Sequence, residues 1–469
     1  MKIQLNRFLT ASIFYIFANS LGQGIILFSS IIFTRIMSQE HYGLYVNYYS
    51  VVALFTPFVG ANLFIGLNIG YFDFREKRNE FRASLTLLSL IIFIIFSSIV
   101  ILSAFLIKYF FNQTFSLFML LFALMHAYSF FIINFYNSYA NMENRYKIKS
   151  LLLILPNILQ VGLSLLFIYT IRQNTYKERV WGSSFGVFIC AFILFFIMLS
   201  QNRNLINKQY FTYALKISVP SILSSIAYMV MQQSDHLMIT KYVGAEKTAV
   251  YGLVYTIGNI LYAFLQATSG AFQAWIYRML NSKNFLIIKK IQKWYLYFFI
   301  ILTFGLLMIA PELIKLLSPA SYWDFRYIPP FIAGSSMIII NNFYTTIGEF
   351  YKKTGIISLC VAVAALCNII LNIYAIQKFG AHAAAYTSFI SYVLLVLFDR
   401  FFLMRKIKVP IYSDICFLVF FLIIILGCIV FKFILCYLLL RYIVFMSIIL
   451  FLMIYAFLKR KEFVDLVIK

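Results

Sequence analysis

Charged side chains inside or beside long apolar segments are the residues of this chain best suited to chemistry. Arg35, Lys241 and Arg278 lie at the ends of such segments, and Asp235 lies six residues before Lys241. A charge at the centre of a membrane helix costs about 2.5 to 3.5 kcal/mol on insertion scales. The cations therefore either extend to lipid headgroups or contact an anionic ligand. Burial of Asp235 would raise its affinity for a proton and favour proton exchange.

Amide and acid side chains form a second set of candidates. Glu349 lies near the end of an apolar segment, where it either acts on a ligand or cation or pairs with Lys352 or Lys353 three and four residues later. Four amides inside apolar segments either contact a ligand or join helices to one another. They are Asn62, Asn68, Gln266 and Gln273.

The elements that must position these residues are membrane-spanning helices. The chain has 469 residues, of which 63% are hydrophobic and 12% charged, and a soluble fold cannot bury that much apolar surface. Charge-free runs such as 83–107 and 354–377 exceed the roughly 20 residues that a spanning helix needs. The first apolar segment, 8–34, is too long for a signal peptide and is expected to remain as the first helix.

The loop pattern predicts fourteen spans, with both chain ends on one side. Thr56-Pro57 is expected to kink the second span, because proline removes a backbone donor. The spans are 10–34, 42–72, 83–107, 115–139, 150–171, 181–200, 217–240, 248–277, 294–316, 327–351, 355–376, 383–399, 413–431 and 442–458.

The net charge of +24 orients the chain in the membrane. Most of the 39 Lys and Arg residues fall in the segments predicted to be cytoplasmic, as the positive-inside rule requires. Both termini are therefore expected in the cytoplasm, and the charge needs no nucleic-acid partner. The six cysteines lie almost entirely in predicted spans without a C-x-x-C motif, which indicates neither a disulfide framework nor a metal site.

One charged, turn-like phrase occurs twice. "TRIMSQEHYGLY" begins at Thr34 and "TKYVGAEKTAVY" begins at Thr240, 206 positions later, each at the outer end of a span. We interpret this as an internal duplication rather than as chance similarity between two turns. Six spans separate the copies, so the halves are parallel, as in transporters that place a site between two rocking halves. The expected division is 1–205, 206–410 and an accessory helix pair with a tail at 411–469.

Three stretches resemble segments of one known family. "RIMSQEHYGLYVNYYS" at 35–50 resembles its first external turn, and "QQSDHLMITKYVGAEKTAVYGLVY" at 232–255 resembles its seventh and eighth helices, with the aspartate at Asp235. "NIILNIYAIQKFGAHAAAYTSFISY" at 368–392 resembles its late Asn-rich helix and the small-residue helix that follows. The family is that of the bacterial polysaccharide, or O-antigen repeat-unit, flippases of the multidrug/oligosaccharidyl-lipid/polysaccharide exporter superfamily.

The resemblance implies an all-α polytopic membrane protein with two parallel six-helix halves, a twelve-helix exporter core and an extra C-terminal pair. It implies flipping of a polyprenyl-diphosphate-linked oligosaccharide to the external leaflet of the bacterial inner membrane, for O-antigen, capsule or exopolysaccharide synthesis. Arg35, Lys241 and Arg278 would contact pyrophosphate, the four amides would contact sugar, and Asp235 and Glu349 would serve ion coupling. Polymerase and chain-length proteins would be partners, and no cofactor is implied.

Two other classes of membrane protein are alternatives to a flippase. Membrane-embedded sugar polymerases and glycosyltransferases also have many helices, but no external segment here exceeds about a dozen residues and no D-x-D, H-E-x-x-H or P-loop spacing occurs. We therefore expect no catalytic residue and no enzyme activity. A drug/cation antiporter of the same superfamily would favour an acidic cavity, whereas the intramembrane charges here are mainly basic.

Overall fold

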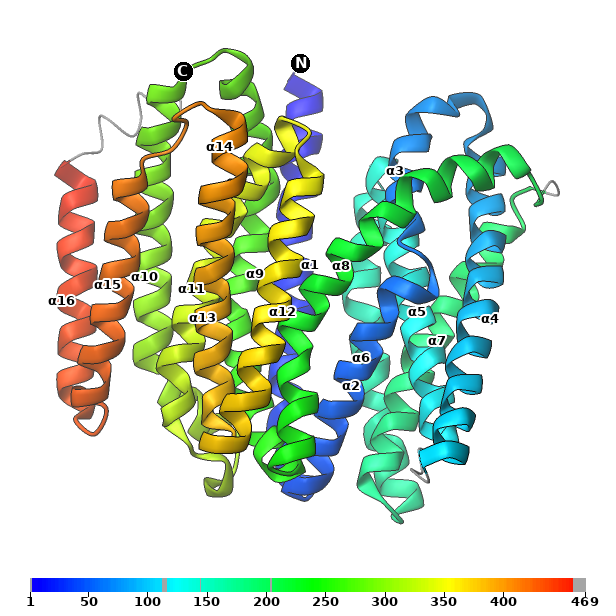
Figure 1. Cartoon of the computed structure of the whole chain (residues 1–469), viewed down its shortest axis with the longest axis horizontal. Coiled ribbons are helices and arrows are strands. Elements are labelled where there is room, and N and C mark those ends of the chain that lie inside the picture. The colour runs from blue at the N-terminus through cyan, green and yellow to red at the C-terminus, as the bar shows by residue number, and fades with distance from the viewer. Residues whose placement is uncertain (1, 112–115, 144, 203–204, 459–469) are drawn as a thin grey trace. The chain divides into compact units, whose positions relative to one another are not determined.

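The protein is described by a computed structural model that covers residues 2–111, 116–143, 145–202 and 205–458. The regular elements of these residues are sixteen α-helices, three short 3-10 turns and one π-helical turn (Figure 1). Chain contacts divide the molecule into unit 1, Met1–Ala249, and unit 2, Val250–Lys469. Helix α9 carries the chain from one unit into the other.

Unit 1 contains eight complete helices and the start of α9. They are α1 (Lys2–Ile36), α2 (Gln39–Val59), α3 (Leu63–Asp73), α4 (Arg78–Phe111), α5 (Leu117–Met142), α6 (Tyr146–Ile171), α7 (Thr175–Leu199) and α8 (Lys208–Tyr242), followed by α9 (Ala245–Asn281), with the 3-10 turn η1 (Arg75–Lys77) before α4. Helix α8 packs against α2 and α3, and α1 packs against α6.

Unit 2 contains the rest of α9 and all later elements. They are α10 (Phe285–Leu317), the 3-10 turns η2 (Ala320–Tyr322) and η3 (Phe325–Tyr327), α11 (Ile328–Phe350), α12 (Thr354–Phe379), α13 (His382–Phe398), the π-helical turn η4 (Asp399–Leu403), α14 (Met404–Ile407), α15 (Asp414–Ile434) and α16 (Leu438–Leu458).

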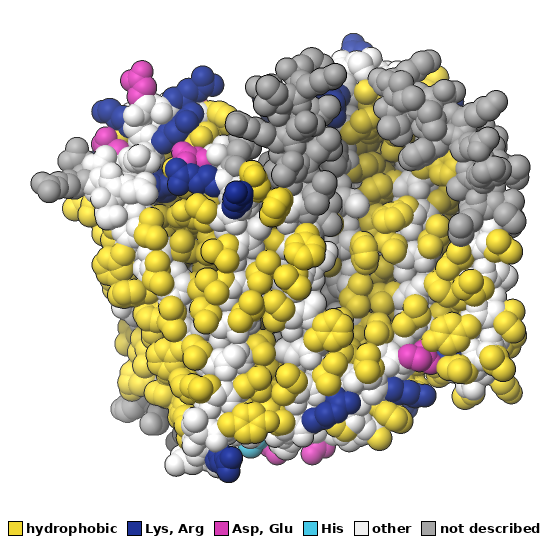
Figure 2. Space-filling view, turned by 180° about the vertical axis from the view of Figure 1, so that it is seen from behind, with side chains coloured by type: hydrophobic (Ala, Val, Ile, Leu, Met, Phe, Trp, Pro, Cys, Tyr) yellow, Lys and Arg dark blue, Asp and Glu magenta, His cyan; other side chains and the backbone are white. Residues whose placement is uncertain are grey.

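The predicted spans coincide with helices. Among the described residues, twelve helical segments have the length and apolar composition needed to cross a membrane. The other two predicted spans, 327–351 and 442–458, fall on α11 and α16. Hydrophobic side chains cover the middle of the face in Figure 2, while Lys and Arg gather towards its two ends. The chain is therefore a multi-pass helical membrane protein.

The second predicted span differs from a kinked helix. It is broken into α2 and α3 at residues 60–62, where Ala61 and Asn62 have φ angles of 44° and 51°. The break comes three residues after Pro57, where the Phe131 ring fills the space beside Gly60, so that a Cβ at Gly60 would stand 2.2 Å from it. Asparagine tolerates the left-handed conformation better than most residues. The kink expected at Thr56-Pro57 is therefore a break of the helix three residues later, within one candidate span, Gln39–Asp73.

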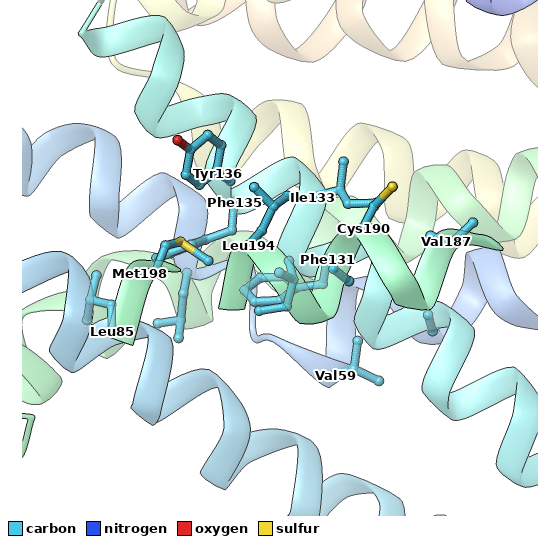
Figure 3. Close-up of a cluster of buried hydrophobic side chains, with 14 of the residues drawn as sticks. Val59, Leu85, Phe131, Ile133, Phe135, Tyr136, Val187, Cys190, Leu194 and Met198 are labelled. Carbon is cyan, nitrogen blue, oxygen red and sulfur yellow. The ribbon is translucent and has the colours of Figure 1, made fainter. Parts of the chain in front are cut away.

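Close helix packing forms the core of unit 1. Phe131 and Phe135 of α5 lie among Leu85, Leu194 and Met198 from neighbouring helices (Figure 3). Lipid tails are as apolar as these side chains, so small residues that permit close contact drive association. Helices α6 and α7 meet in this way: a Cβ on Gly182 would stand 2.3 Å from the backbone of Ser164.

Within unit 2, an ion pair with a buried arginine joins α16 to α10. Helices α15 and α16 both pack against α10 (Figure 1). Arg441 of α16 is 2% exposed, and its Nη1 donates to Glu312 Oε2 at 3.1 Å and to the Met308 carbonyl at 3.0 Å. Removing one partner of such a pair would leave a buried charge uncompensated.

Candidate functional site

The two copies of the repeated phrase lie against each other in unit 1. Gln39 Nε2 donates to the Glu246 carbonyl at 3.3 Å, and Gly43 is packed onto the backbone of Ala245. The turn after α1 and the turn after α8 are therefore on the same side of unit 1. This contact agrees with the parallel orientation expected of the duplication.

The ends of the two preceding helices also match locally. Thr34 Oγ1 donates to the Ser30 carbonyl at 2.7 Å, and Thr240 Oγ1 donates to the His236 carbonyl at 2.8 Å. The two donors are 206 positions apart, and so are the two acceptors. Each threonine hydroxyl thus makes the same bond to the carbonyl four positions earlier in its own helix.

Arg35 and Lys241 end α1 and α8 as exposed cations on these contacting turns. Arg35 Nη1 donates to the Ile31 carbonyl at 2.8 Å, which directs the guanidinium back along its own helix. Lys241 Nζ lies 5.4 Å from the centre of the Tyr242 ring. Both side chains can reach a lipid headgroup or an anionic ligand.

Asp235 lies deeper in α8 and is buried. Its side chain is 3% exposed, and the neighbouring His236 is 2% exposed. The carboxyl is thus separated from water, as a residue that exchanges protons in a membrane must be for part of its cycle. Burial alone does not test a role of Asp235 in ion coupling, which stays a prediction.

Asn62 and Asn68 join helices within unit 1. Asn62 Nδ2 donates to Ser225 Oγ of α8 at 2.8 Å, and Asn68 Nδ2 donates to Ser138 Oγ of α5 at 3.2 Å. Asn62 is also buried, at 3% exposure. These bonds favour the interhelical interpretation over a sugar contact.

In unit 2 the structure brings Gln273 and Glu349 together. Gln273 Nε2 donates to Glu349 Oε2 at 2.6 Å, and the Tyr277 hydroxyl donates to the same oxygen at 3.3 Å. The hydrogen-bond partners of Glu349 thus come from α9, where the sequence offered Lys352 and Lys353 as alternatives. Gln266 and Arg278 are exposed on α9.

Arg179 of α7 is a buried cation that the sequence analysis did not single out. It is 7% exposed, and its guanidinium carbon lies 3.7 Å from the centre of the Tyr45 ring and 3.9 Å from that of Phe33. These stacking contacts tie α7 to α1 and α2. A cation–π cage of this kind is worth about 2 kcal/mol or more when desolvated.

Helices α12 and α13 share a buried polar ladder. Thr387 Oγ1 donates to Asn372 Oδ1, Asn372 Nδ2 donates to Asn368 Oδ1 at 3.1 Å, and Asn368 Nδ2 donates to Ser388 Oγ at 3.4 Å. The Asn-x-x-x-Asn spacing was visible in the stretch at 368–392. Its pairing with Thr387 and Ser388 required the α12–α13 turn to be known.

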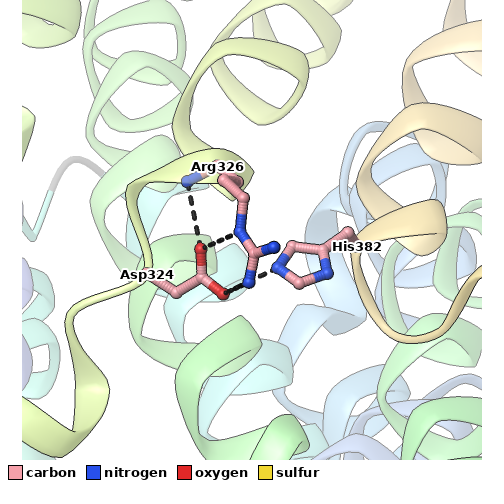
Figure 4. A network of polar contacts seen from close by, with 3 residues as sticks. All are labelled: Asp324, Arg326 and His382. Carbon is pink, nitrogen blue, oxygen red and sulfur yellow. Dashed lines mark hydrogen bonds and ion pairs between the residues drawn. The ribbon is translucent and has the colours of Figure 1, made fainter.

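A charged cluster connects the α10–α11 connection to the start of α13. Arg326 Nε and Nη2 donate to the two carboxylate oxygens of Asp324 at 2.9 Å and 2.8 Å, and His382 Nε2 lies 2.6 Å from Asp324 Oδ2 (Figure 4). Burial by itself would raise the pKa of the Asp324 carboxyl. Hydrogen bonds from Arg326 and His382 outweigh it and lower the pKa to about 2.

The fold is that of the exporters that include lipid II and multidrug transporters. The structure of the lipid II flippase MurJ in an inward closed conformation is 17% identical in sequence. The alignment covers 97% of this chain and 100% of MurJ, with a TM-score of 0.63. An inward-facing multidrug resistance MATE family transporter is 12% identical, and the alignment covers 83% of this chain and 95% of the transporter, with a TM-score of 0.60. A mutant form of the Vibrio cholerae MATE transporter VcmN is 13% identical, and the alignment covers 86% of this chain and 97% of VcmN, with a TM-score of 0.56.

The chain belongs to the family described as polysaccharide biosynthesis protein, whose profile matches residues 8–276. A second profile, MatE, matches residues 220–374. No curated protein matches the chain. Fold and family together define a flippase or exporter of the multidrug/oligosaccharidyl-lipid/polysaccharide superfamily.

Proposed function

We propose that this chain flips a polyprenyl-diphosphate-linked oligosaccharide repeat unit from the cytoplasmic to the external leaflet by alternating access. The observation that carries the proposal is the pair of exposed cations, Arg35 and Lys241, on two contacting turns in a member of a polysaccharide biosynthesis family. The product would be O-antigen, capsule or exopolysaccharide. The membrane would be the bacterial inner membrane, with both termini in the cytoplasm and with polymerase and chain-length proteins as partners.

The anionic pyrophosphate is the part of this substrate that hydrocarbon excludes most strongly. Arg278, at the end of α9, would receive it, and Arg35 and Lys241 would contact it before release. Arginine binds phosphate through two parallel hydrogen bonds, while lysine acts as a point charge. Because the contacts are divided between the two ends of the path, no single position would bind the pyrophosphate too tightly to release it.

The sugars need hydrogen-bond donors and acceptors. Gln266 is exposed on α9 and its side chain bonds with that of Tyr262, and Gln273 Nε2 donates to Glu349 Oε2 at 2.6 Å. A carboxylate shared by an amide and a phenol offers both acceptor and donor groups to hydroxyls. Among the four amides proposed as sugar contacts, Gln266 is the most exposed and is therefore the best placed.

Ion coupling would reset the empty carrier. An inside-negative potential already drives an anionic headgroup outward by about 2.3 kcal/mol per charge per 100 mV. Asp235, buried in α8, would then bind and release a cation during the return step. The proposal assigns no catalytic residue, no metal and no cofactor.

Complementation tests the proposal. A flippase-deleted host would carry Arg35→Gln, Lys241→Gln and Arg278→Gln together, and surface polysaccharide would be measured at matched membrane abundance. We expect the triple variant to lose export, while a control variant at two other exposed cations, Arg172→Gln and Lys177→Gln, retains it. Full export by the triple variant would leave the cations as lipid anchors only.

A drug/cation antiporter is the second candidate, and the MatE match over residues 220–374 favours it. An antiporter would lower the retention of a cationic dye in expressing cells, whereas a flippase of lipid-linked sugars would leave dye retention unchanged. The two activities are thus separated by one inexpensive measurement on the same strain.

A further inference from the structure

Asp399 is a fully buried acid at the point where α13 changes its helical geometry. The residue is 0% exposed. It is the first residue of the π-helical turn Asp399–Leu403, which lies within the candidate span His382–Ile407. Single π-turns inside membrane or soluble helices occur frequently at functional sites. No part of the proposed transport path uses this residue.

The carboxyl contacts neutral groups from two other helices. Asn341 Nδ2 of α11 donates to Asp399 Oδ2 at 2.7 Å, and the buried thiol of Cys360 of α12 faces the same carboxyl. The second oxygen, Oδ1, is buried and accepts no hydrogen bond within the described part of the chain. One oxygen is thus satisfied and the other is left without a donor.

Arg400, the nearest cation along the chain, is paired with a different acid. Arg400 Nε and Nη2 donate to the two oxygens of Asp414 at 2.8 Å and 2.6 Å. The titratable side chains around Asp399 are Tyr344 of α11 and Cys360 of α12. The ion pairs of the described residues do not include Asp399.

A buried carboxylate without a positive partner is far more costly than the neutral acid, so the group is neutralised rather than left charged. Neutralisation requires either a proton or a metal cation. Hard cations such as Ca²⁺ and Mg²⁺ need about six or more oxygen ligands. The groups at Asp399 are an amide N–H and a thiol, which donate hydrogen bonds or bind soft metals but do not form an oxygen cage.

We propose that Asp399 is a proton-binding site of unit 2: it holds a proton while the C-terminal end of α13 is packed against α11 and α12, and it passes the proton to water when these helices separate. The protonated acid is a donor, so the proton is placed on Oδ1, the oxygen that accepts no hydrogen bond from the described residues. This site is separate from Asp235 in sequence and in its helices, and it does not depend on which cargo the chain carries.

Infrared spectroscopy of the purified, full-length protein tests the proposal directly. A protonated carboxyl has a C=O stretching band that an ionised carboxylate lacks. We expect the wild-type spectrum at pH 7 to contain such a band that Asp399→Asn removes and that Glu76→Gln, a change at an exposed acid of unit 1, retains. A spectrum that is the same in wild type and Asp399→Asn would overturn the proposal.

Thermal stability against pH gives a second readout. Asparagine has the shape of the protonated acid but cannot ionise, so Asp399→Asn is expected to fold. An acid that stays protonated in the folded state loses stability as pH rises above the unfolded value near 4. The wild-type midpoint temperature should therefore fall relative to Asp399→Asn with rising pH. A constant difference, or failure of Asp399→Asn to assemble while Glu76→Gln assembles, would contradict a protonated Asp399.

Discussion

Replacing Gly43 by alanine tests whether the two repeated turns are held in contact by the absence of one side chain. A Cβ at Gly43 would stand 1.7 Å from the Ala245 carbonyl oxygen and 2.6 Å from its carbon. Both obstructing atoms belong to backbone, so neither can rotate away. The turns would have to separate by about 1.3 Å before the oxygen reached 3.0 Å, below which real Cβ contacts are essentially absent.

The expected cost follows from two opposing effects. In a free helix, glycine to alanine stabilises by about 1 kcal/mol. Forcing one extra methyl group into a closed contact costs about 1 to 3 kcal/mol, and separation of the turns would also weaken the bond from Gln39 to Glu246, which is already 3.3 Å long. We expect a net destabilisation of about 1 to 2 kcal/mol.

The assay is the midpoint temperature at which the protein in detergent loses its monodisperse elution peak. Gly162→Ala in α6 is the matched control, because a Cβ there would meet no atom within 4 Å. Gly43→Ala should melt earlier than wild type, and Gly162→Ala should melt at the same temperature or later. Equal midpoints for wild type and Gly43→Ala would refute the contact between the turns.

Three further predictions concern charge. Arg35→Lys should reduce polysaccharide export more than Lys241→Arg, because lysine cannot replace a two-point phosphate contact whose charged hydrogen bonds are worth about 1.5 to 3 kcal/mol each; equal export by both variants would favour simple lipid anchoring. Asp235→Asn should lower export and remove its pH dependence in vesicles, since an amide cannot exchange a proton, and a normal pH profile would exclude a coupling role. Asp324→Asn should destabilise the protein by about 1 kcal/mol after solvent screening. Because the pKa of Asp324 is lowered to about 2, the variant should melt earlier than wild type above pH 4, and this difference should disappear as pH falls through 2. A difference in midpoint temperature that does not depend on pH would contradict the ion pair.

The membrane-spanning helices were predictable because the signal for them is local. A run of about 20 apolar residues must cross the bilayer whatever surrounds it, so segments such as 83–107 and 354–377 fall on α4 and α12. The repeated turns were visible for the same reason, since Thr34 and Thr240 mark similar helix ends. The parallel halves and the boundary between 205 and 206 stay a prediction that superposition of the two six-helix segments would test.

The contacts within the candidate site were not predictable, because they join residues far apart in the chain. Nothing in the sequence distinguishes Arg179 from the other cations near span ends, because the rings that it contacts, Phe33 and Tyr45, come from α1 and α2. The break after Pro57 depends on the Phe131 ring beside Gly60, which comes from α5. A sequence pattern describes the residue that is present, while a tertiary contact decides what that residue can do.

Transport in reconstituted vesicles tests the central claim most directly. A polyprenyl-diphosphate-linked oligosaccharide would be placed in the inner leaflet, and its arrival in the outer leaflet would be followed by a membrane-impermeant reagent for the sugar. Vesicles that contain the chain should expose the sugar faster than protein-free vesicles, and the Arg35, Lys241 and Arg278 triple glutamine variant should not. Equal rates with and without the wild-type chain, in vesicles that export a cationic dye, would contradict the flippase and establish the antiporter.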